Sequence, residues 1–360
     1  MKILYFDCWS PKGHLQFNKI HLEALSKIGE VYTVFREGAF ADLFIPHVHR
    51  LMGIPDKYYL DYSSSFKSRM LLSRMMRFVW RKINANEWDY IILATYDATS
   101  LFLSQKFKNA FVIDHNTIAD LDNPVKGWFY RHLSKNITHV LFNDDMKRKM
   151  DENGIYNYII VPHGFLPMIP HESDDTFAND FYARNKINKE ERLLFIPSLS
   201  RASEDLIGRF IYKDDVNSFL KENNLVLFTK SLVERPSMSN IRIINDYLSK
   251  EEYEFLFLNS LCIIMLYSTA FKYRTSGVLN ECFANQIPCI FNNNEALMSY
   301  GRYINNDKTV FSNTEEMKES ILSVLSRDNN KPFYQALDEI ESPLEAWAKI
   351  LKPGNSLGTI

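Results

Sequence analysis

Residues 261–292 read LCIIMLYSTAFKYRTSGVLNECFANQIPCIFN, and this stretch decides the fold. Residues 261–266 form a short, continuous apolar run, which is typical of a strand buried on both faces. A polar loop follows, and either Thr275 or Ser276 can cap the helix behind it, whose apolar side chains share one face. Residues 289–291 are a second apolar run. Strand, loop, helix and strand form a βαβ unit, which predicts a parallel sheet.

The loop of this unit is predicted to bind an anion, which we interpret as phosphate. It lies at the carboxyl end of a strand, where open α/β sheets bind ligands. It also offers a helix N-terminus and two cations. The loop residues expected to take part are Lys272, Arg274, Thr275, Ser276 and Gly277. Glu281, about one and a half turns into the helix, is placed to reach a hydroxyl group beside the phosphate.

Length and composition restrict the class of protein. A chain of 360 residues with 46% hydrophobic residues predicts a packed globular protein of two domains. Its net charge of −2 argues against a nucleic-acid partner. The four cysteines show no metal-binding spacing, and three of them lie in apolar runs or faces as small core residues do, which fits a reducing cytoplasm. No apolar run reaches the roughly 18 residues that a membrane span needs, and the first apolar run is too short for a signal peptide.

The first part of the chain alternates between strands and helices, which predicts a doubly wound parallel sheet in an N-terminal domain of residues 1–165. Strands are predicted at residues 2–6, 31–35, 90–94, 110–113, 138–142 and 158–161. Helices are predicted at residues 16–28, 66–84, 99–107, 125–135 and 144–153, and residues 38–62 are expected to be irregular.

A second alternation begins after residues 166–190, whose prolines and acidic run predict an interdomain linker. Strands are predicted at residues 193–197, 225–229, 241–245, 261–266, 289–291 and 310–311. Helices are predicted at residues 205–223, 250–258, 314–326 and 332–351, besides the one that follows the loop. The predicted fold is two Rossmann-like α/β domains, 1–165 and 191–335, that face a central cleft. Residues 336–360 form a C-terminal helix and tail, for which packing against the N-terminal domain is one arrangement.

Several segments at strand ends resemble the motifs of GT-B glycosyltransferases, most nearly the family 4, or group 1, enzymes that use nucleotide-sugars. The matching segments are 160–164 (IVPHG, with His163), 112–115 (VIDH, with His115), 196–201 (IPSLSR, with Arg201), Glu281 and the turn 285–288 (NQIP). The resemblance implies that His115 faces the donor sugar, Arg201 binds the diphosphate and Glu281 binds the ribose. It also implies a reaction without a bound metal or cofactor.

Two positions depart from the family pattern. Tyr273 stands where the family has a second glutamate, and Leu206 stands where it has a lysine. Lys230, or Lys272 with Arg274, could supply the missing positive charge. These departures bear on the retaining mechanism of the family rather than on the fold.

Each candidate residue of the N-terminal domain has a structural alternative. His115 is interpreted as a catalytic residue, and its alternative is a cap at the end of a strand. Asp97 could be the general base for an acceptor hydroxyl if the enzyme inverts, or the N-cap of the next helix. Gly13, beside His14, could bring backbone N–H groups close to a ligand, or form a plain turn.

A basic stripe lies on one face of the helix at residues 66–84. Lys67, Arg74, Arg77 and Arg81 are spaced by seven, three and four residues, which places them together. The stripe is either a solvated face or a docking surface for an anionic membrane that carries a lipid-linked acceptor.

The sequence therefore predicts a glycosyltransferase that moves a sugar from a nucleotide-sugar to a glycan or glycolipid acceptor in bacterial surface polysaccharide synthesis. We expect it in the cytoplasm, peripheral on the inner face of the cytoplasmic membrane. The alternatives are another nucleotide-sugar enzyme of the epimerase type, or a catalytically inactive binding or scaffold protein.

Overall fold

The computed structural model of the chain describes residues 1–11, 14–41, 43–59, 66–104, 107, 110–168, 175–197, 203–244, 248–328 and 330–351. It divides into two compact units. The first comprises Met1–Gly164, Tyr273–Thr275 and Ile340–Ile360, and the second comprises Phe165–Lys272 and Ser276–Glu339. How the two units lie about a cleft stays a prediction.

The first unit is built on a parallel sheet of seven strands in the order β3-β2-β1-β4-β5-β6-β7. Its strands are β1 Lys2–Asp7, β2 Glu30–Arg36, β3 Val48–Ile54, β4 Tyr90–Thr95, β5 Phe111–Ile113, β6 Thr138–Leu141 and β7 Tyr158–Ile160. The central strands are covered on both sides, and every residue of β4 is buried. This explains why they appear in the sequence as continuous apolar runs.

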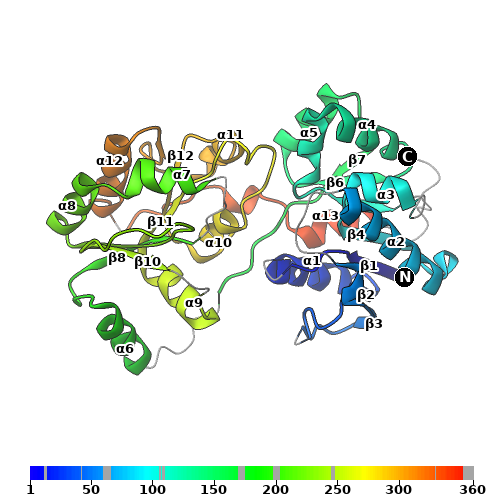
Figure 1. The fold of residues 1–360 in the computed structure, drawn as a ribbon, viewed down its shortest axis with the longest axis horizontal. Coiled ribbons are helices and arrows are strands. Elements are labelled where there is room, and N and C mark those ends of the chain that lie inside the picture. The colour runs from blue at the N-terminus through cyan, green and yellow to red at the C-terminus, as the bar shows by residue number, and fades with distance from the viewer. Residues whose placement is uncertain are drawn as a thin grey trace. The chain divides into compact units, whose positions relative to one another are not determined.

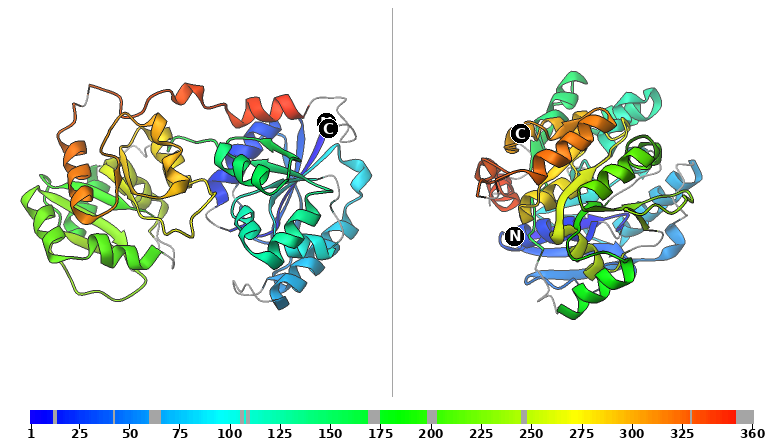
Figure 2. Two further views of the ribbon diagram at one scale, coloured as in Figure 1. Left: turned by 90° about the horizontal axis from the view of Figure 1, so that it is seen from above. Right: turned by 90° about the vertical axis from the view of Figure 1, so that its left-hand side faces the viewer.

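Helices cover both faces of the first sheet. They are α1 Leu15–Ser26, α2 Phe66–Lys82, α3 Ala98–Ser104, α4 Pro124–Leu133, α5 Asp144–Glu152 and α13 Pro343–Ile350. The left-hand view of Figure 2 shows α1 (blue) and α13 (red) on one side of this sheet and α2 and α4 on the other. The last helix therefore packs against the first and belongs to the N-terminal unit.

The second unit repeats this plan with a parallel sheet of six strands in the order β10-β9-β8-β11-β12-β13. Its strands are β8 Arg192–Ile196, β9 Leu225–Lys230, β10 Ile241–Ile244, β11 Ser260–Met265, β12 Cys289–Asn292 and β13 Val310–Phe311. Its helices include α6 Asp175–Asn185, α8 Asp214–Glu222, α9 Lys250–Asn259, α10 Gly277–Asn285, α11 Glu295–Met298 and α12 Thr314–Leu325. Figure 1 shows α8 and α12 on one side of the sheet and α9 with α6 on the other.

The sequence-based prediction was wrong for residues 38–62, which were expected to be irregular. They contain the edge strand β3 and a short 3-10 helix at Asp56–Tyr58. Most of β3 is exposed or half-buried, because an edge strand needs fewer apolar residues than a central one. It therefore lacks the apolar run by which the other strands were recognised.

The predicted linker at residues 166–190 was also wrong in part. The second unit begins at Phe165, and residues 175–185 form α6. Phe177 and Phe181, four residues apart, pack against Phe255 of α9 with ring centroids at 5.5 and 4.8 Å. This i, i+4 aromatic pair was the helix signal inside the acidic segment.

Two long helices that were predicted in the second half are interrupted. Residues 205–223 form a short helix α7 at Glu204–Leu206, a π-helical turn at Ile207–Ile211 and then α8. Residues 332–351 are helical only from Pro343 onward, after a 3-10 turn at Leu337–Glu339. Pro343 occupies the first turn of α13 and Ser342 caps it, which is a helix start rather than a helix interior.

Candidate functional site

A cluster of histidines lies at the carboxyl edge of the first sheet. Phe17 of α1 contacts His115, which follows β5, and His163, which follows β7, with ring centroids at 4.2 and 5.1 Å. The ring of His14 lies 4.6 Å from that of His115. The structure thus brings the predicted residues His115 and His163 into one cluster and adds His14. Gly13, the predicted neighbour, lies outside the described residues.

The imidazoles of His115 and His163 are kept neutral by burial. Burial lowers the pKa of His115 well below its usual value, and it lowers the pKa of His163 to about 4. A neutral imidazole has one donor and one acceptor nitrogen. Among the described residues, Nε2 of His115 is buried and has no hydrogen-bond partner. His115 therefore has a polar atom left for a ligand.

Asp7, at the end of β1, fixes the loop that carries His14. Its Oδ1 accepts hydrogen bonds from the backbone N–H of Trp9 at 3.1 Å and of Ser10 at 2.8 Å, and also from the hydroxyl of Thr95. Its Oδ2 accepts one from Asn18 at 2.8 Å. Burial raises the pKa of this carboxyl, but His14 and the hydrogen bonds from Asn18 and Thr95 outweigh that effect and hold the pKa below its usual value. Asp7 is therefore a buried carboxylate that shapes the loop.

Asp114, which precedes His115 in the chain, belongs to a second buried network. Asp114 and His139 are both fully buried, and Asp114 Oδ2 accepts from His139 Nδ1 at 2.6 Å. Nε2 of His139 lies 2.8 Å from the hydroxyl of Ser134, which also donates to the backbone carbonyl of Tyr130. The network therefore holds both ring nitrogens of His139. Tyr96 donates to the other oxygen of Asp114 at 2.7 Å.

Asp97 has the contacts of a helix cap. Its Oδ1 accepts from the backbone N–H and the hydroxyl of Ser100, both at 2.7 Å, and its Oδ2 lies 3.4 Å from Arg69. The capping alternative left open by the sequence is thus the arrangement found at the start of α3. These contacts occupy both oxygens, and a role of Asp97 as general base stays a prediction.

The loop after β11 leads into α10 as the sequence indicated; both elements belong to the second unit, whereas Tyr273–Thr275 of the loop belong to the first. Ser276 is the N-cap of α10, and its hydroxyl accepts from the backbone N–H of Leu279 at 3.1 Å. The same hydroxyl lies 2.8 Å from that of Tyr267, at the end of β11. Ser276 is nearly fully buried, so its side chain has a structural role, and a ligand would meet the backbone of this turn.

Glu281 lies half-buried on the second turn of α10. Its Oε2 accepts a hydrogen bond from the hydroxyl of Tyr253, on α9, at 2.7 Å. Burial raises the pKa of Glu281 to about 7, although the bond from Tyr253 opposes the shift. The carboxyl therefore changes charge near neutral pH. Tyr253 was not identified from the sequence, because a partner 28 positions away leaves no local signal.

The remaining predicted residues fall at the ends of strands or in loops. Lys230 ends β9, and Lys272, Arg274 and Thr275 are half-buried in the loop before α10. Gly277 is the exposed first residue of α10 and has open space around it, so no close contact requires a glycine there. Arg201 lies outside the described residues.

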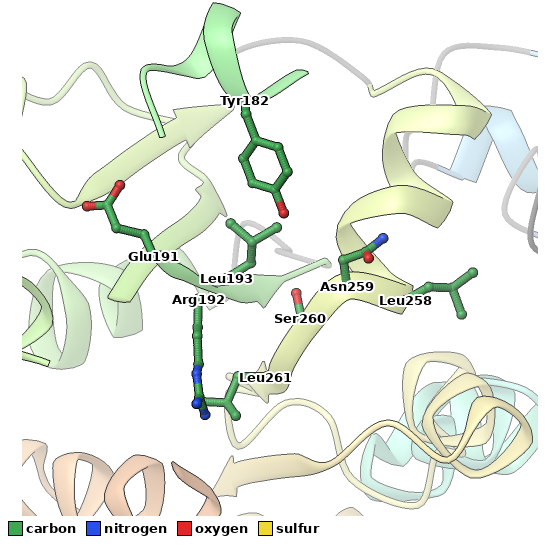
Figure 3. Close-up of a pocket in the computed structure, with 8 residues that line it drawn as sticks. All are labelled: Tyr182, Glu191, Arg192, Leu193, Leu258, Asn259, Ser260 and Leu261. Carbon is green, nitrogen blue, oxygen red and sulfur yellow. The ribbon is translucent and has the colours of Figure 1, made fainter. Parts of the chain in front are cut away.

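A pocket in the second unit lies at the opposite end of its sheet. It opens at the amino ends of β8 and β11, beside Arg192 and Ser260. Figure 3 shows the side chain of Tyr182 directed into this pocket and that of Arg192 directed away from Tyr182. Ligands of doubly wound sheets bind at the carboxyl ends of the strands, so this pocket does not belong to the predicted anion site.

No group of three His, Cys, Asp or Glu side chains among the described residues could hold a metal ion. No helix within the described ranges has the length and apolar character needed to cross a bilayer. All four cysteines are free thiols in the cores of the two units, as expected for small core residues.

Comparison with solved structures identifies the fold. No protein-family model matches the sequence, and no curated protein is similar to it. The chain is similar to a UDP-N-acetylglucosamine 2-epimerase from Rickettsia bellii, with a TM-score of 0.59, 13% identity and coverage of 98% of this chain and 95% of that one. It is similar to Anabaena Alr3699/HepE, solved with UDP and glucose, with a TM-score of 0.61, 13% identity and coverage of 97% and 94%. It is also similar to WaaG, a glycosyltransferase involved in lipopolysaccharide biosynthesis, with a TM-score of 0.61, 13% identity and coverage of 98% and 100%.

These similarities extend over nearly the whole chain. Because the sequence identities are low, the similarities establish the fold alone. The chain has the GT-B fold, with two Rossmann-like α/β units built on parallel sheets of seven and six strands. The predicted fold class is thereby confirmed.

Proposed function

We propose that this protein is a glycosyltransferase that takes a sugar from a nucleotide-sugar and moves it to a glycan or glycolipid acceptor. The observation that carries the proposal is the β11–loop–α10 unit, in which a capped helix N-terminus and Glu281 follow one strand of a doubly wound sheet. HepE, which shares the fold at 13% identity, was solved with UDP and glucose. We place bacterial surface polysaccharide synthesis as the setting, by resemblance.

The nucleotide would bind at the start of α10. Backbone N–H groups at the N-terminus of a helix bind phosphate oxygens, and α10 has nine residues, enough for a helix dipole. Arg274 and Lys272, just before the cap, would bind the diphosphate together with Arg201 and Lys230. Glu281, one turn further on, would accept hydrogen bonds from ribose hydroxyls. These roles use fixed positive charge at the leaving group and involve no bound metal in this proposal.

The transferred sugar would lie near the histidine cluster of the first unit. His115 is neutral, and its Nε2 is left for a ligand, so it can hydrogen-bond a sugar hydroxyl without placing a charge beside the anomeric carbon. His163 and the Gly13 loop would complete this part of the site.

A second candidate is a nucleotide-sugar epimerase, which the similarity to the Rickettsia bellii enzyme favours. An epimerase converts its nucleotide-sugar without an acceptor, whereas a transferase releases nucleoside diphosphate as it glycosylates one. An inactive binding protein, suggested by Tyr273 and Leu206, would bind nucleotide and convert nothing.

The acceptor side is proposed to dock on an anionic membrane. Lys67, Arg74, Arg77 and Arg81 are exposed on α2. Arg77 donates to the backbone carbonyl of Leu103 in α3 at 2.5 Å, and Phe102 of α3 packs against Trp128 of α4.

Trp128 and Val125 are 46% and 67% exposed. Cations beside exposed apolar side chains are typical of surfaces that bind the membrane interface. Each cation near an anionic leaflet contributes about 1 kcal/mol, and salt weakens this attraction.

Vesicle co-sedimentation tests the membrane surface. Anionic vesicles should recover the protein at low salt, and recovery should fall for Arg74→Glu/Arg81→Glu. Lys221→Glu/Lys331→Glu is the matched control, because it makes the same charge change at exposed lysines of the second unit. Equal recovery of the two double variants would show that the cations of α2 do not bind the membrane.

Thermal-shift measurements with UDP, GDP, CDP and ADP test the proposed function. A ligand that binds only the native state raises the unfolding temperature. We expect one diphosphate to raise it, and Arg274→Ala to weaken that ligand by roughly 1.5–3 kcal/mol, the range for a hydrogen bond to a charged group. If none of the four stabilises the protein, a nucleotide-sugar enzyme is excluded.

A further inference from the structure

We propose that Tyr253 is the positioning residue of Glu281: its hydroxyl holds Oε2 and leaves Oε1 to accept hydrogen bonds from the ribose hydroxyls of the nucleotide. The inference rests on the proposed function and adds to it a residue outside the predicted loop. Tyr253 lies on α9, which runs beside α10 below the second sheet in Figure 1. It donates to Glu281 at 2.7 Å.

The two oxygens of Glu281 have different surroundings. Oε2 takes the hydroxyl of Tyr253, whereas Oε1 has no hydrogen bond or ion pair within the described ranges. A carboxylate can accept several hydrogen bonds. Because one oxygen is fixed by a tyrosine from the neighbouring helix, the other is held in one direction rather than rotating freely. A vicinal pair of ribose hydroxyls needs an acceptor held in that way.

The packing of Tyr253 shows that its hydroxyl is itself fixed. Its ring contacts Phe195 of β8 and Phe257 of α9, with centroids at 5.8 Å in each case. α9 begins with a capping box between Ser249 and Glu252, which fixes the first turn of the helix. Tyr253 follows Glu252 directly. The donor therefore comes from a packed helix and not from a loop.

The groups that face Glu281 are acidic or neutral. They are Tyr253 and Glu254 of α9, Tyr267 at the end of β11, and Cys282 beside it on α10. None of these is a cation, so the hydrogen bond from Tyr253 is the interaction among them that favours the charged carboxylate. Burial and Glu254 both raise the pKa of Glu281, and Tyr253 lowers it. Ribose binding should then depend on pH near neutrality, and the hydrogen bond from Tyr253 should set the pH at the midpoint of this dependence.

The experiment measures the affinity of the full-length protein for UDP, GDP, CDP and ADP by calorimetry, and carries the tightest ligand from pH 5.5 to 8.5. Affinity should fall as the pH is lowered through the pKa of Glu281. Tyr253→Phe should move this midpoint upward and weaken binding at pH 7 about tenfold, the low end for a hydrogen bond to a charged group. At pH 8.5, where the carboxyl is charged in both proteins, the variant should regain part of this affinity and keep the loss that comes from the freer Glu281 side chain.

Two further variants complete the design. Glu281→Gln should abolish the pH dependence. Tyr182→Phe removes a tyrosine hydroxyl elsewhere in the second unit and should leave the profile unchanged. The 2′-deoxy form of the ligand should lose affinity for the wild type, and lose less for Tyr253→Phe.

The outcomes separate the two proposals. If the wild type binds none of the four diphosphates, the proposed function fails and this inference fails with it. If the wild type binds one, but Tyr253→Phe keeps the wild-type midpoint and the wild-type preference for the 2′-hydroxyl, only the role of Tyr253 is overturned.

Discussion

Trp347 donates its indole N–H to Nδ1 of His21 at 3.1 Å, so the last helix, α13, is joined to the first, α1, inside the core of the N-terminal unit. Both side chains are fully buried. Burial lowers the pKa of His21 to about 3, which keeps its Nδ1 free to accept that hydrogen bond at neutral pH. The C-terminal residues from Ile340 onward thus belong to the first unit, although most of the chain between Gly164 and Ile340 forms the second.

This pair makes stability depend on pH. A histidine whose pKa is lower in the folded state contributes stability above its unfolded pKa, near 6.5, and loses it as the pH falls toward the folded value. Between pH 6 and 4, His21 should add about 1.4 kcal/mol per pH unit to the slope of the unfolding free energy. His21→Gln, which can still accept from Trp347, should remove that share. All five tryptophans lie in the first unit, so urea denaturation followed by tryptophan fluorescence reports on it. An unchanged slope would show that His21 is protonated in the folded protein.

The packing of α13 against α1 is predicted to require a glycine at position 164. It has φ +75°, and a Cβ built on it would lie 2.6 Å from Cγ of Pro343 and 2.8 Å from Cγ2 of Ile20. Gly164→Ala should therefore destabilise the first unit by about 2–4 kcal/mol, from left-handed backbone strain and overpacking together. Gly38→Ala is the control, because Gly38 has the same φ and open space around it. Equal losses for the two variants would mean that the contact with Pro343 contributes nothing.

The buried hydrogen bonds of Asp114 with His139 and Tyr96 are predicted to support the strand end that presents His115. Asp114→Ala removes the partner of both groups and leaves buried polar atoms unpaired, which should cost about 1–3 kcal/mol of unfolding free energy. Asp114→Asn keeps the size of the side chain and can still accept hydrogen bonds, so it should cost less than Asp114→Ala. Urea titration of the wild type and the two variants provides the comparison. Wild-type stability in Asp114→Ala would show that these hydrogen bonds do not support the strand end.

His115 is predicted to act on the sugar and not on the nucleotide. His115→Ala should lower the turnover of sugar transfer while the affinity for free nucleoside diphosphate stays within about twofold, because the lost interaction forms with the sugar. His163→Ala serves as a comparison from the same cluster. Wild-type turnover in His115→Ala would remove this residue from the site.

The sequence was sufficient for the doubly wound fold because buried parallel strands such as β4 and β11 are continuous apolar runs. It was insufficient for β3, an edge strand with one covered side, and for α6, where an acidic composition hid the Phe177 and Phe181 pair. The positions of His115, just after β5, and of Ser276, the cap of α10, could be predicted from the α/β topology. Tyr253 and His21 could not, because their partners are 28 and 326 positions away and only the fold brings them together.

Mass spectrometry of the reaction products would detect sugar transfer from a nucleotide-sugar. Full-length protein is incubated with UDP-, GDP-, CDP- and ADP-sugars, with and without a mixture of glycolipid and oligosaccharide acceptors, beside Glu281→Gln. We expect one donor to yield nucleoside diphosphate and a glycosylated acceptor in equal amounts, only when acceptor is present, and much less with the variant. Conversion of a nucleotide-sugar into its epimer without acceptor, or binding of a donor with no product of either kind, would show that the protein is not a glycosyltransferase.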